Sequence, residues 1–475
     1  MNEIKSFILR FTKERNLTVI ALAETLGYKS KTSLDRLMNA NSRESSIQKF
    51  EELMLAAFDL SETERAALHR AVQIACEGDE QYRISEKMHA LLFTRNTPPD
   101  TPKPVLRDAE TNAPVNWKSR YRHAKNMRVI VWDCRSIPAL FSLLARMMRE
   151  QPLSVTHYLT ESRDRLATMA ALEAIFPVLY RPEYEGFIIP RQGCDDELHQ
   201  SDLLFIDWTD GQGARHGDII AFRSPHAGRL AEVDLTTFER LLHLFKEPQP
   251  CTPLKMTYPE YTSFEDYIRY SADIAALEHD HSVWKVKPDL CVDLIPPHIL
   301  EAALMRGPVT PKDETYCTVI RALRKVYDKR YQNTFGKKKH CFTLFKQKAM
   351  QNFVETGRTT DHFWAMDTFT KRERVEIISS LLEQQLHNPY VHLLFLKDDD
   401  AIRDMEVICY GDEGVMLLET DIDYRFDRQT DVMITHPDVV KLYQDFFMKS
   451  LVRTYALPEN KTIALFKGWL ANELG

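Results

Sequence analysis

Long apolar runs are missing from this sequence of 475 residues. No stretch approaches the roughly 18 uncharged apolar residues that a membrane-spanning helix needs, so we expect no membrane partner. The first residues, Met1 to Ser6, lack the apolar segment of a secretory leader, and none of the eight cysteines forms a C-x-x-C pair. We therefore expect reduced thiols and a cytoplasmic protein.

Glycine is scarce, and familiar catalytic signatures are missing. The 15 glycines against 23 prolines argue against flexible linkers of low complexity. The patterns G-x-x-x-x-G-K-[ST], H-E-x-x-H and G-x-S-x-G do not occur.

The Gly211–Gly213 segment could cradle a phosphate, but a hairpin turn is the better interpretation. His279 and His281, together with Glu278, could bind a metal, but no fourth ligand is evident and a polar helix end is the better interpretation. We expect no catalytic residues, no metal and no cofactor, and hence no enzyme.

Acidic residues are few at the start of the chain, although they prevail elsewhere. The whole chain carries a formal net charge of −7, yet residues 1–50 contain nine lysines and arginines against five acidic residues. That segment is therefore +4 and the remainder −11. A basic segment ahead of an acidic body suits a modular protein that binds DNA, because contacts of lysine and arginine to phosphates supply most non-specific affinity.

Five segments within residues 1–78 repeat apolar residues at helical spacing, beginning with residues 2–14. Thr18 is suited to cap the second helix, because its hydroxyl can accept a bond from a free backbone N–H. Gly27 supplies a tight turn before the third helix. Ser61–Glu64 has the form of a capping box and predicts the start of the fifth helix. The pattern predicts an all-α domain of five helices.

Three short motifs in this domain are similar to those of the Cro/CI-type, or XRE-family, helix-turn-helix. They are Leu22–Gly27 (Leu-Ala-Glu-Thr-Leu-Gly), Ser33–Leu37 (Ser-Leu-Asp-Arg-Leu) and the trailing Leu60–Leu68 segment. The resemblance covers about 75 residues and implies that the second helix crosses a DNA backbone while the third enters the major groove. A purely structural helical bundle is the alternative.

The resemblance implies DNA contacts from the start of the third helix and the residues just beyond it. Arg36 could bond a guanine edge with both ends of its guanidinium, while Lys29 and Lys31 would contact phosphates. For each position, a solvated polar helix face is the alternative. Two half-sites one helical turn apart would require a homodimer. The predicted DNA-binding residues are Lys29, Ser30, Lys31, Thr32, Ser33, Arg36, Asn39, Asn41 and Arg43.

Beyond this domain the sequence predicts an α+β multidomain protein with a large α/β body. Residues 79–125 read as an irregular, Pro-rich connector, since four prolines fall within residues 96–104. Alternating strand and helix patterns predict one α/β half at residues 126–250. A mostly helical insert is expected at residues 251–356, followed by a second α/β half at residues 357–475.

The two predicted halves share a helix–proline–strand pattern, seen at Ser142–His157 and again at Ser380–His392. Two related α/β halves are similar to the phospholipase-D-like fold, which some bacterial regulators carry as a sensor rather than an enzyme. The catalytic pattern of that family is H-x-K followed, after four residues, by Asp. The one H-x-K in this chain, at His123–Lys125, has Ile130 at the position of the Asp. The resemblance therefore implies a non-catalytic body.

Residues at strand ends could line a ligand cleft if the two halves face each other. A place in the hydrophobic core is the simpler interpretation, above all for the aromatic residues. The candidate ligand-binding residues are Trp132, Asp133, Arg135, Trp364 and Asp367.

Taken together, these patterns predict a sequence-specific, DNA-binding transcriptional regulator. Its body would sense a small molecule or peptide and form the homodimer. Two alternatives use the same helical N-terminus to dock a partner protein. In one the body is an enzyme or a phage-defence effector, and in the other the chain is a scaffold.

Overall fold

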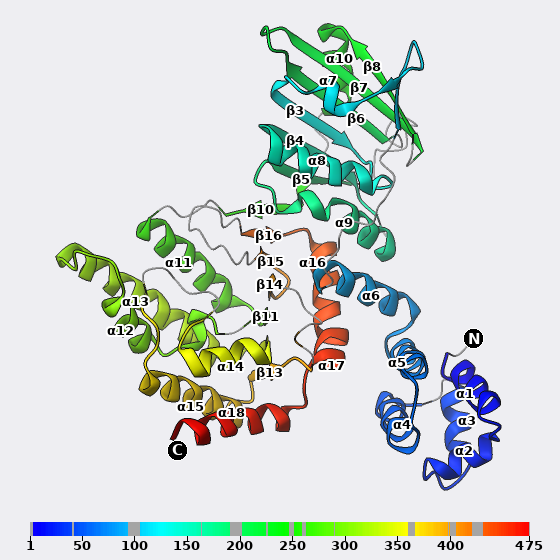
Figure 1. Ribbon diagram of the computed structural model, residues 1–475, viewed down its shortest axis with the longest axis vertical. Helices are drawn as coiled ribbons and strands as arrows, with labels where there is room; N and C mark the ends of the chain where they lie inside the picture. Colours follow the sequence, from blue (N-terminus) through cyan, green and yellow to red (C-terminus); the bar gives the residue numbers. More distant parts are fainter. Residues whose placement is uncertain are drawn as a thin grey trace. The chain divides into compact units, whose positions relative to one another are not determined.

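The structure is a computed structural model with an all-helical N-terminal unit and a body of two mixed β-sheets, so the predicted α+β class is confirmed (Figure 1). The chain divides into two compact units, Met1–Lys87 and Met88–Gly475. Among the described residues, every helix is too short or too polar to span a lipid bilayer. The structure describes residues 3–39, 42–93, 105–162, 164–190, 202–224, 227–246, 251–258, 263–288, 290–359, 366–397, 399, 405–419 and 431–474.

The N-terminal unit contains the five predicted helices, and two of their predicted caps are confirmed. The Thr18 hydroxyl accepts a hydrogen bond from the backbone N–H of Ala21 at 3.0 Å. Ser61 and Glu64 form a complete capping box, in which each side chain bonds the backbone of the other residue. The five helices are α1 (Glu3–Glu14), α2 (Val19–Thr25), α3 (Thr32–Met38), α4 (Glu44–Ala57) and α5 (Glu62–Glu77).

One hydrophobic core holds these helices together. Phe11 of α1, Phe50 of α4 and Leu68 of α5 are all buried in it, together with Leu34 of α3. Gly27 ends the α2 segment with a φ of +73°, a conformation that side chains other than glycine rarely adopt. This turn therefore fixes the change of direction between α2 and α3.

The predicted irregular connector, residues 79–125, needs correction. Residues Asp79–Phe93 form helix α6, and Met88 and Leu92 of this helix are buried. The structure describes no residue between 94 and 104, which holds the proline run. After it come β1 (Val105–Asp108), β2 (Pro114–Val115) and α7 (Trp117–Arg120), and β1 pairs in parallel with a strand of the first sheet. Helix α6 was not predicted, because the proline run outweighed the helical spacing of the apolar residues that precede it.

The first sheet has the strand order β2-β1-β8-β7-β6-β3-β4-β5-β9. Strands β3, β4 and β5 run parallel and are joined by α8 and α9, while β6, β7 and β8 form an antiparallel meander. The Gly211–Gly213 segment is the turn between β6 and β7, which confirms the hairpin interpretation. The bounds are β3 (Lys125–Trp132), α8 (Pro138–Glu150), β4 (Leu153–Thr160), α9 (Arg165–Leu179), β5 (Tyr184–Ile189), β6 (Asp202–Thr209), β7 (Arg215–Ser224), β8 (Ala227–Val233), α10 (Leu235–Lys246) and β9 (Thr252–Pro253).

Alternating side chains of β3 pack on the two faces of this sheet. Ile130 and Trp132 pack in one cluster with Phe238 of α10. On the other face, Phe141 of α8 lies against His157 of β4, with ring centroids 4.9 Å apart. Because both faces are covered there, β3 is apolar and buried from Val129 to Trp132, as expected for a strand in the middle of a sheet.

The second sheet has the order β10-β16-β15-β14-β11-β12-β13 and repeats the connectivity of the first. Strands β11, β12 and β13 are parallel and consecutive, and β14, β15 and β16 follow as an antiparallel meander on the other side of β11. Residues 251–356 are mostly helical, as expected, but they also supply β10, β11 and β12 and so form part of this sheet, not a separate insert. The strands are β10 (Lys255–Thr257), β11 (Val283–Lys287), β12 (Cys341–Phe345), β13 (Val391–Phe395), β14 (Met405–Tyr410), β15 (Gly414–Glu419) and β16 (Val432–Ile434).

The structure also corrects the sequence match between the halves. The pattern at Ser142–His157 covers α8 and β4, the second parallel strand of its sheet. The pattern at Ser380–His392 covers the end of α15 and β13, the third parallel strand. The two segments are therefore not equivalent, although the halves to which they belong share one strand order.

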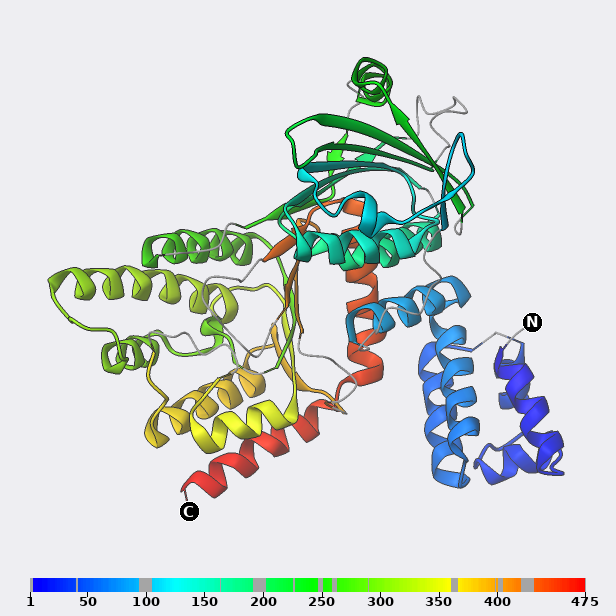
Figure 2. The same cartoon turned by 45° about the horizontal axis from the view of Figure 1, so that its top comes forward.

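Helices surround the second sheet, and most of its hydrophobic core lies among α12 to α15 and α18. Figure 2 shows the same elements from a second direction. The bounds are α11 (Phe264–Asp280), a 3-10 turn (Val292–Leu294), α12 (Pro297–Arg306), α13 (Glu314–Phe335), α14 (Gln347–Thr356), α15 (Lys371–His387), α16 (Pro437–Asp445), a π-helical turn (Phe446–Leu451), α17 (Val452–Tyr455) and α18 (Glu459–Leu474).

Candidate functional site

The outer side of α3 and its flanking loops presents polar and cationic side chains, as the sequence predicts. Ser33 is half-buried, and Asn41 lies outside the described residues. The remaining predicted DNA-binding residues are all exposed: Lys29, Ser30, Lys31, Thr32, Arg36, Asn39 and Arg43.

The inner side of the same helix is apolar and anchors it. Leu34, Leu37 and Met38 are each at most 9% exposed, and they pack in the core of the N-terminal unit. Lys31 lies 3.9 Å from Asp35, which is a weak surface pair. Within the described residues, Arg36 forms no hydrogen bond or ion pair, so its guanidinium is available to an external acceptor.

A second candidate site lies at the carboxyl edge of β3 and β4 in the body. Asp133 and Cys134, directly after β3, have φ values of +56° and +55°. Two successive non-glycine residues in this region cost conformational energy, and such strain gathers at functional sites. The turn is held by Asp202, whose two carboxylate oxygens accept bonds from the Cys134 backbone N–H at 2.8 Å and the Ser136 hydroxyl at 2.7 Å.

His157 supports this strained turn from beneath. In its Nε2–H form the ring donates to the backbone carbonyl of Asp133 at 2.6 Å, and the Tyr184 hydroxyl donates to Nδ1 at 2.9 Å. The ring is fully buried, and burial lowers the pKa of His157 to about 4. It is therefore neutral near pH 7 and acts as a fixed structural support.

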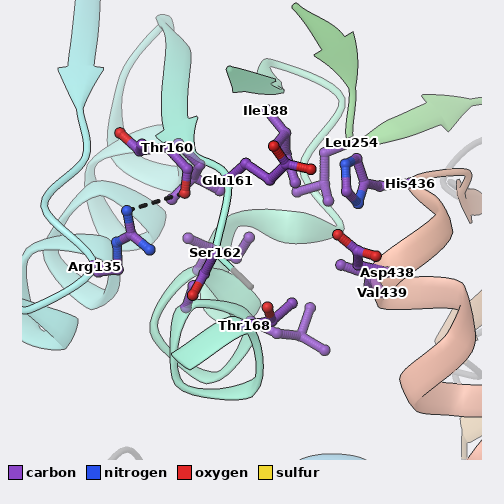
Figure 3. A pocket seen from close by; sticks show the side chains of 14 residues that line it. Arg135, Thr160, Glu161, Ser162, Thr168, Ile188, Leu254, His436, Asp438 and Val439 are labelled. Carbon is purple, nitrogen blue, oxygen red and sulfur yellow. Dashed lines mark hydrogen bonds between the residues drawn. The ribbon is translucent and has the colours of Figure 1, made fainter. Parts of the chain in front are cut away.

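Arg135 follows the turn, and its charge is already compensated. Its guanidinium donates twice to the Asp133 carboxylate, with both bonds 2.6 Å long, and once to the carbonyl of Thr160 at 3.0 Å. Figure 3 shows the bond to Thr160 as a dashed line. The hydrogen bonds to Asp133 are the main reason why the pKa of Arg135 lies above its usual value. Because Asp133 already compensates its charge, Arg135 is poorly suited to bind a further anion.

A cleft opens beside Arg135, between the first half and the start of α16 (Figure 3). Glu161 comes from the end of β4, while His436 and Asp438 come from the start of α16. The imidazole of His436 is 6% exposed, and its Nδ1 is buried without a hydrogen-bond partner in the described part of the chain. Burial lowers the pKa of His436, although the nearby carboxylates of Asp438 and Glu161 oppose that shift.

The walls of this cleft are largely apolar and come from both halves. Leu172 and Ile175 of α9 and Val439 of α16 line it, together with Leu254, which lies where the chain passes from one sheet to the other. The space open to the centre of a water molecule is about 30 Å³. Since one water requires roughly 10 to 15 Å³ by this measure, the cleft holds about two heavy atoms as it stands.

Polar contacts fix the two halves against each other around the cleft. Arg165 at the start of α9 bonds Asp445 at the end of α16 at 2.8 Å. Lys255 donates to the carbonyls of Leu179 and Arg181, both at 2.8 Å, and so satisfies the last turn of α9. Burial lowers the pKa of Lys255 to about 8. The cleft therefore lies within an ordered junction.

The five candidate ligand-binding residues of the sequence analysis do not gather in one place. Arg135 lines the cleft, and the Asp133 carboxylate holds the Arg135 guanidinium by two hydrogen bonds. The ring of Trp132, in contrast, is buried on the α10 face of the first sheet. Asp367 belongs to the second half, where its backbone N–H bonds the carbonyl of Ala303. Trp364 lies outside the described residues.

Sequence reasoning missed Glu161, His157, His436 and Asp438. No local pattern marks them, since β4 and α16 lie some 280 residues apart and meet only in the folded chain. Pro437, which opens α16, locates the helix but does not indicate what its first turn contacts. Among the described residues, no three His, Cys, Asp or Glu side chains are grouped as ligands for a metal ion.

Neither a scan against protein-family models nor a search of curated proteins finds a match to this chain. The function is consequently argued from the two sites themselves.

Proposed function

We propose that this protein is a sequence-specific DNA-binding regulator, in which α3 reads the major groove and the α/β body controls binding. The observation that carries the proposal is the two-sided character of α3. Its apolar side is buried in the core, while Arg36 on the other side is exposed to solvent, as are Lys29 and Lys31 just before the helix. A rigidly held helix with free donors on one face is the geometry that helix-turn-helix proteins use in the major groove.

The basic charge of the first 50 residues supports the same proposal. Cations on an otherwise acidic chain concentrate positive potential at the proposed interface, and phosphate contacts give affinity that falls steeply with salt. One such module covers few base pairs, so we further propose that a homodimer binds two half-sites about one helical turn apart.

The body is proposed to act as a sensor and not as an enzyme. Six strands of each sheet, β8-β7-β6-β3-β4-β5 and β16-β15-β14-β11-β12-β13, have the same order, which supports the resemblance to a duplicated, non-catalytic sensor body. A ligand that binds one arrangement of the dimer better than another would shift the spacing of the DNA-binding helices, and with it the affinity for the operator.

Selection of bound sequences from a random DNA library by the purified full-length protein tests the proposal. We expect a shared palindromic site, and its affinity should fall by about 1 to 3 kcal/mol, or 5- to 150-fold, in Arg36→Ala, because a bidentate contact to guanine is lost. Fluorescence anisotropy with the selected duplex measures the change.

A matched control is available on α6, where Arg83 is also exposed. Arg83→Ala changes the net charge by the same amount outside the proposed interface, so it should leave affinity nearly unchanged. Equal losses in the two variants would show that Arg36 acts only through charge. If no sequence is enriched over random DNA, the proposed function is wrong.

A second candidate function is supported by apolar residues on the surface of the N-terminal unit. Leu9 of α1, Ile20 of α2 and Leu55 of α4 are each about half exposed, which DNA binding does not explain. An N-terminal unit that docks a protein partner would use such side chains. Ile20→Ser should then abolish partner binding and leave DNA affinity intact, whereas the proposed DNA interface is sensitive to Arg36→Ala.

A further inference from the structure

We propose that the cleft between Glu161 and the start of α16 binds the ammonium group of a small aliphatic amine. This inference gives a ligand class to the sensing body proposed above. It does not depend on α3, because the cleft lies entirely within the Met88–Gly475 unit.

The uncompensated charge in the cleft is negative. Glu161 and Asp438 form no ion pair or side-chain hydrogen bond among the described residues, whereas Arg135, the cation that lines the cleft, is bonded on two sides by Asp133. The remaining titratable side chain of the lining is His436, and burial favours its neutral form. Glu161 is half-buried and Asp438 is exposed, so both carboxylates can attract a cation that enters the cleft from solvent.

His436 is the independent sign that a polar group is missing from this cleft. Its ring is more than nine-tenths buried, and its Nδ1 has no hydrogen-bond partner in the described part of the chain. Figure 3 shows the ring beside the carboxylates of Glu161 and Asp438. Buried polar atoms are almost always bonded, so an orphaned nitrogen next to two free carboxylates indicates a site for an external group. An ammonium group has three N–H donors, so its chemistry matches this set of acceptors.

The size and walls of the cleft limit the chain that carries the ammonium group. Room for about two heavy atoms accommodates the nitrogen and the first methylene. Leu172, Ile175 and Val439 line the cleft and offer that methylene apolar contact, while a longer alkyl chain would extend from the cleft towards solvent. An anionic ligand would be repelled by both carboxylates, and a purely apolar ligand would leave the buried Nδ1 of His436 without a partner, which is costly. The location also fits, because ligands of open α/β sheets bind outside the carboxyl ends of the strands.

The test uses the full-length protein without DNA and three probes with the same alkyl chain. n-Butylammonium, n-butanol and butyrate are titrated at pH 7.5, and ligand-observed NMR gives each dissociation constant. We expect saturable binding of n-butylammonium, at least about tenfold weaker binding of n-butanol, and no binding of butyrate. Glu161→Gln and Asp438→Asn should each weaken n-butylammonium binding about tenfold.

Glu150 supplies the matched control, because it is an exposed carboxylate at the end of α8 and does not line the cleft. Glu150→Gln should bind n-butylammonium as the unchanged protein does. Thermal unfolding checks that each variant is folded, and if Asp438→Asn is not, Glu161→Gln decides alone. Absence of saturable n-butylammonium binding, equal binding of butyrate, or equal affinity in Glu161→Gln and Glu150→Gln would each overturn the proposal. None of these outcomes affects the DNA proposal, which is tested with Arg36→Ala.

Discussion

The α/β half that contains the first sheet should become less stable as the pH falls from 7 to 5, because of His157. In the folded protein burial lowers the pKa of this ring from 6.5 to about 4, so the unfolded chain takes up the proton first. The stabilising contribution is complete above pH 6.5 and is lost as the pH falls from 6.5 towards 4. The burial of His392 and His436 lowers their pKa values too, so they act in the same direction.

The size of the effect is set by the two pKa values. One pKa unit corresponds to about 1.4 kcal/mol, so the fall to about 4 amounts to roughly 3 kcal/mol when the pH is below both values. Between pH 7 and pH 5 the same linkage gives a loss of about 2 kcal/mol. That is a large share of the 5 to 15 kcal/mol typical of a folded domain.

Hydrogen exchange of peptides from β3 and β4 at pH 7 and pH 5, corrected for intrinsic exchange rates, measures this loss locally. In the variant His157→Gln the ring is absent, and the free energy of opening should change between the two pH values by about 2 kcal/mol less than in the unchanged protein. Because all other groups are common to both proteins, the difference isolates His157. An identical pH dependence in the two proteins would refute the argument.

Two further predictions concern stability elsewhere in the chain. Ser61→Ala removes the hydroxyl from the capping box of α5 and should destabilise the N-terminal unit by about 1 kcal/mol. Thermal unfolding of the unit measures this loss, and an unchanged stability would mean that the cap is redundant. Lys285→Met removes a buried cation that bonds Asp293 and lies 3.7 Å from Glu278, and should cost about 3 to 5 kcal/mol in urea unfolding followed by circular dichroism. The double variant Lys285→Met/Asp293→Leu should recover part of that loss, and a double variant less stable than the single one would contradict this account.

The N-terminal unit was predictable almost residue by residue because its signals are local. A cap at Thr18, a turn at Gly27 and a capping box at Ser61 each act within four residues of the sequence. Helical periodicity then fixes which side chains of α3 face the core and which remain exposed, so the exposure of Arg36 follows from the position of Leu34 and Leu37.

The second sheet was misjudged because β11 does not read as a buried strand. Its sequence, Val-Trp-Lys-Val-Lys, carries two lysines, yet Lys285 is 1% exposed and Lys287 is 6% exposed. Lys285 bonds Asp293 from the 3-10 turn that follows the strand, and Lys287 pairs with Glu406 from a distant part of the chain. Pattern analysis assigns lysine to solvent, and only the tertiary structure supplies the counter-charges that allow its burial.

By itself, the sequence determined the helical N-terminal unit, the α+β class and the exposed face of α3, since short-range hydrogen bonds and periodicity encode them. The tertiary structure alone decided that residues 251–356 supply three strands of the second sheet and that Glu161, His436 and Asp438 line one cleft. Such contacts join residues hundreds of positions apart. Their geometry depends on the packing of whole sheets and helices, which no local run of residues specifies.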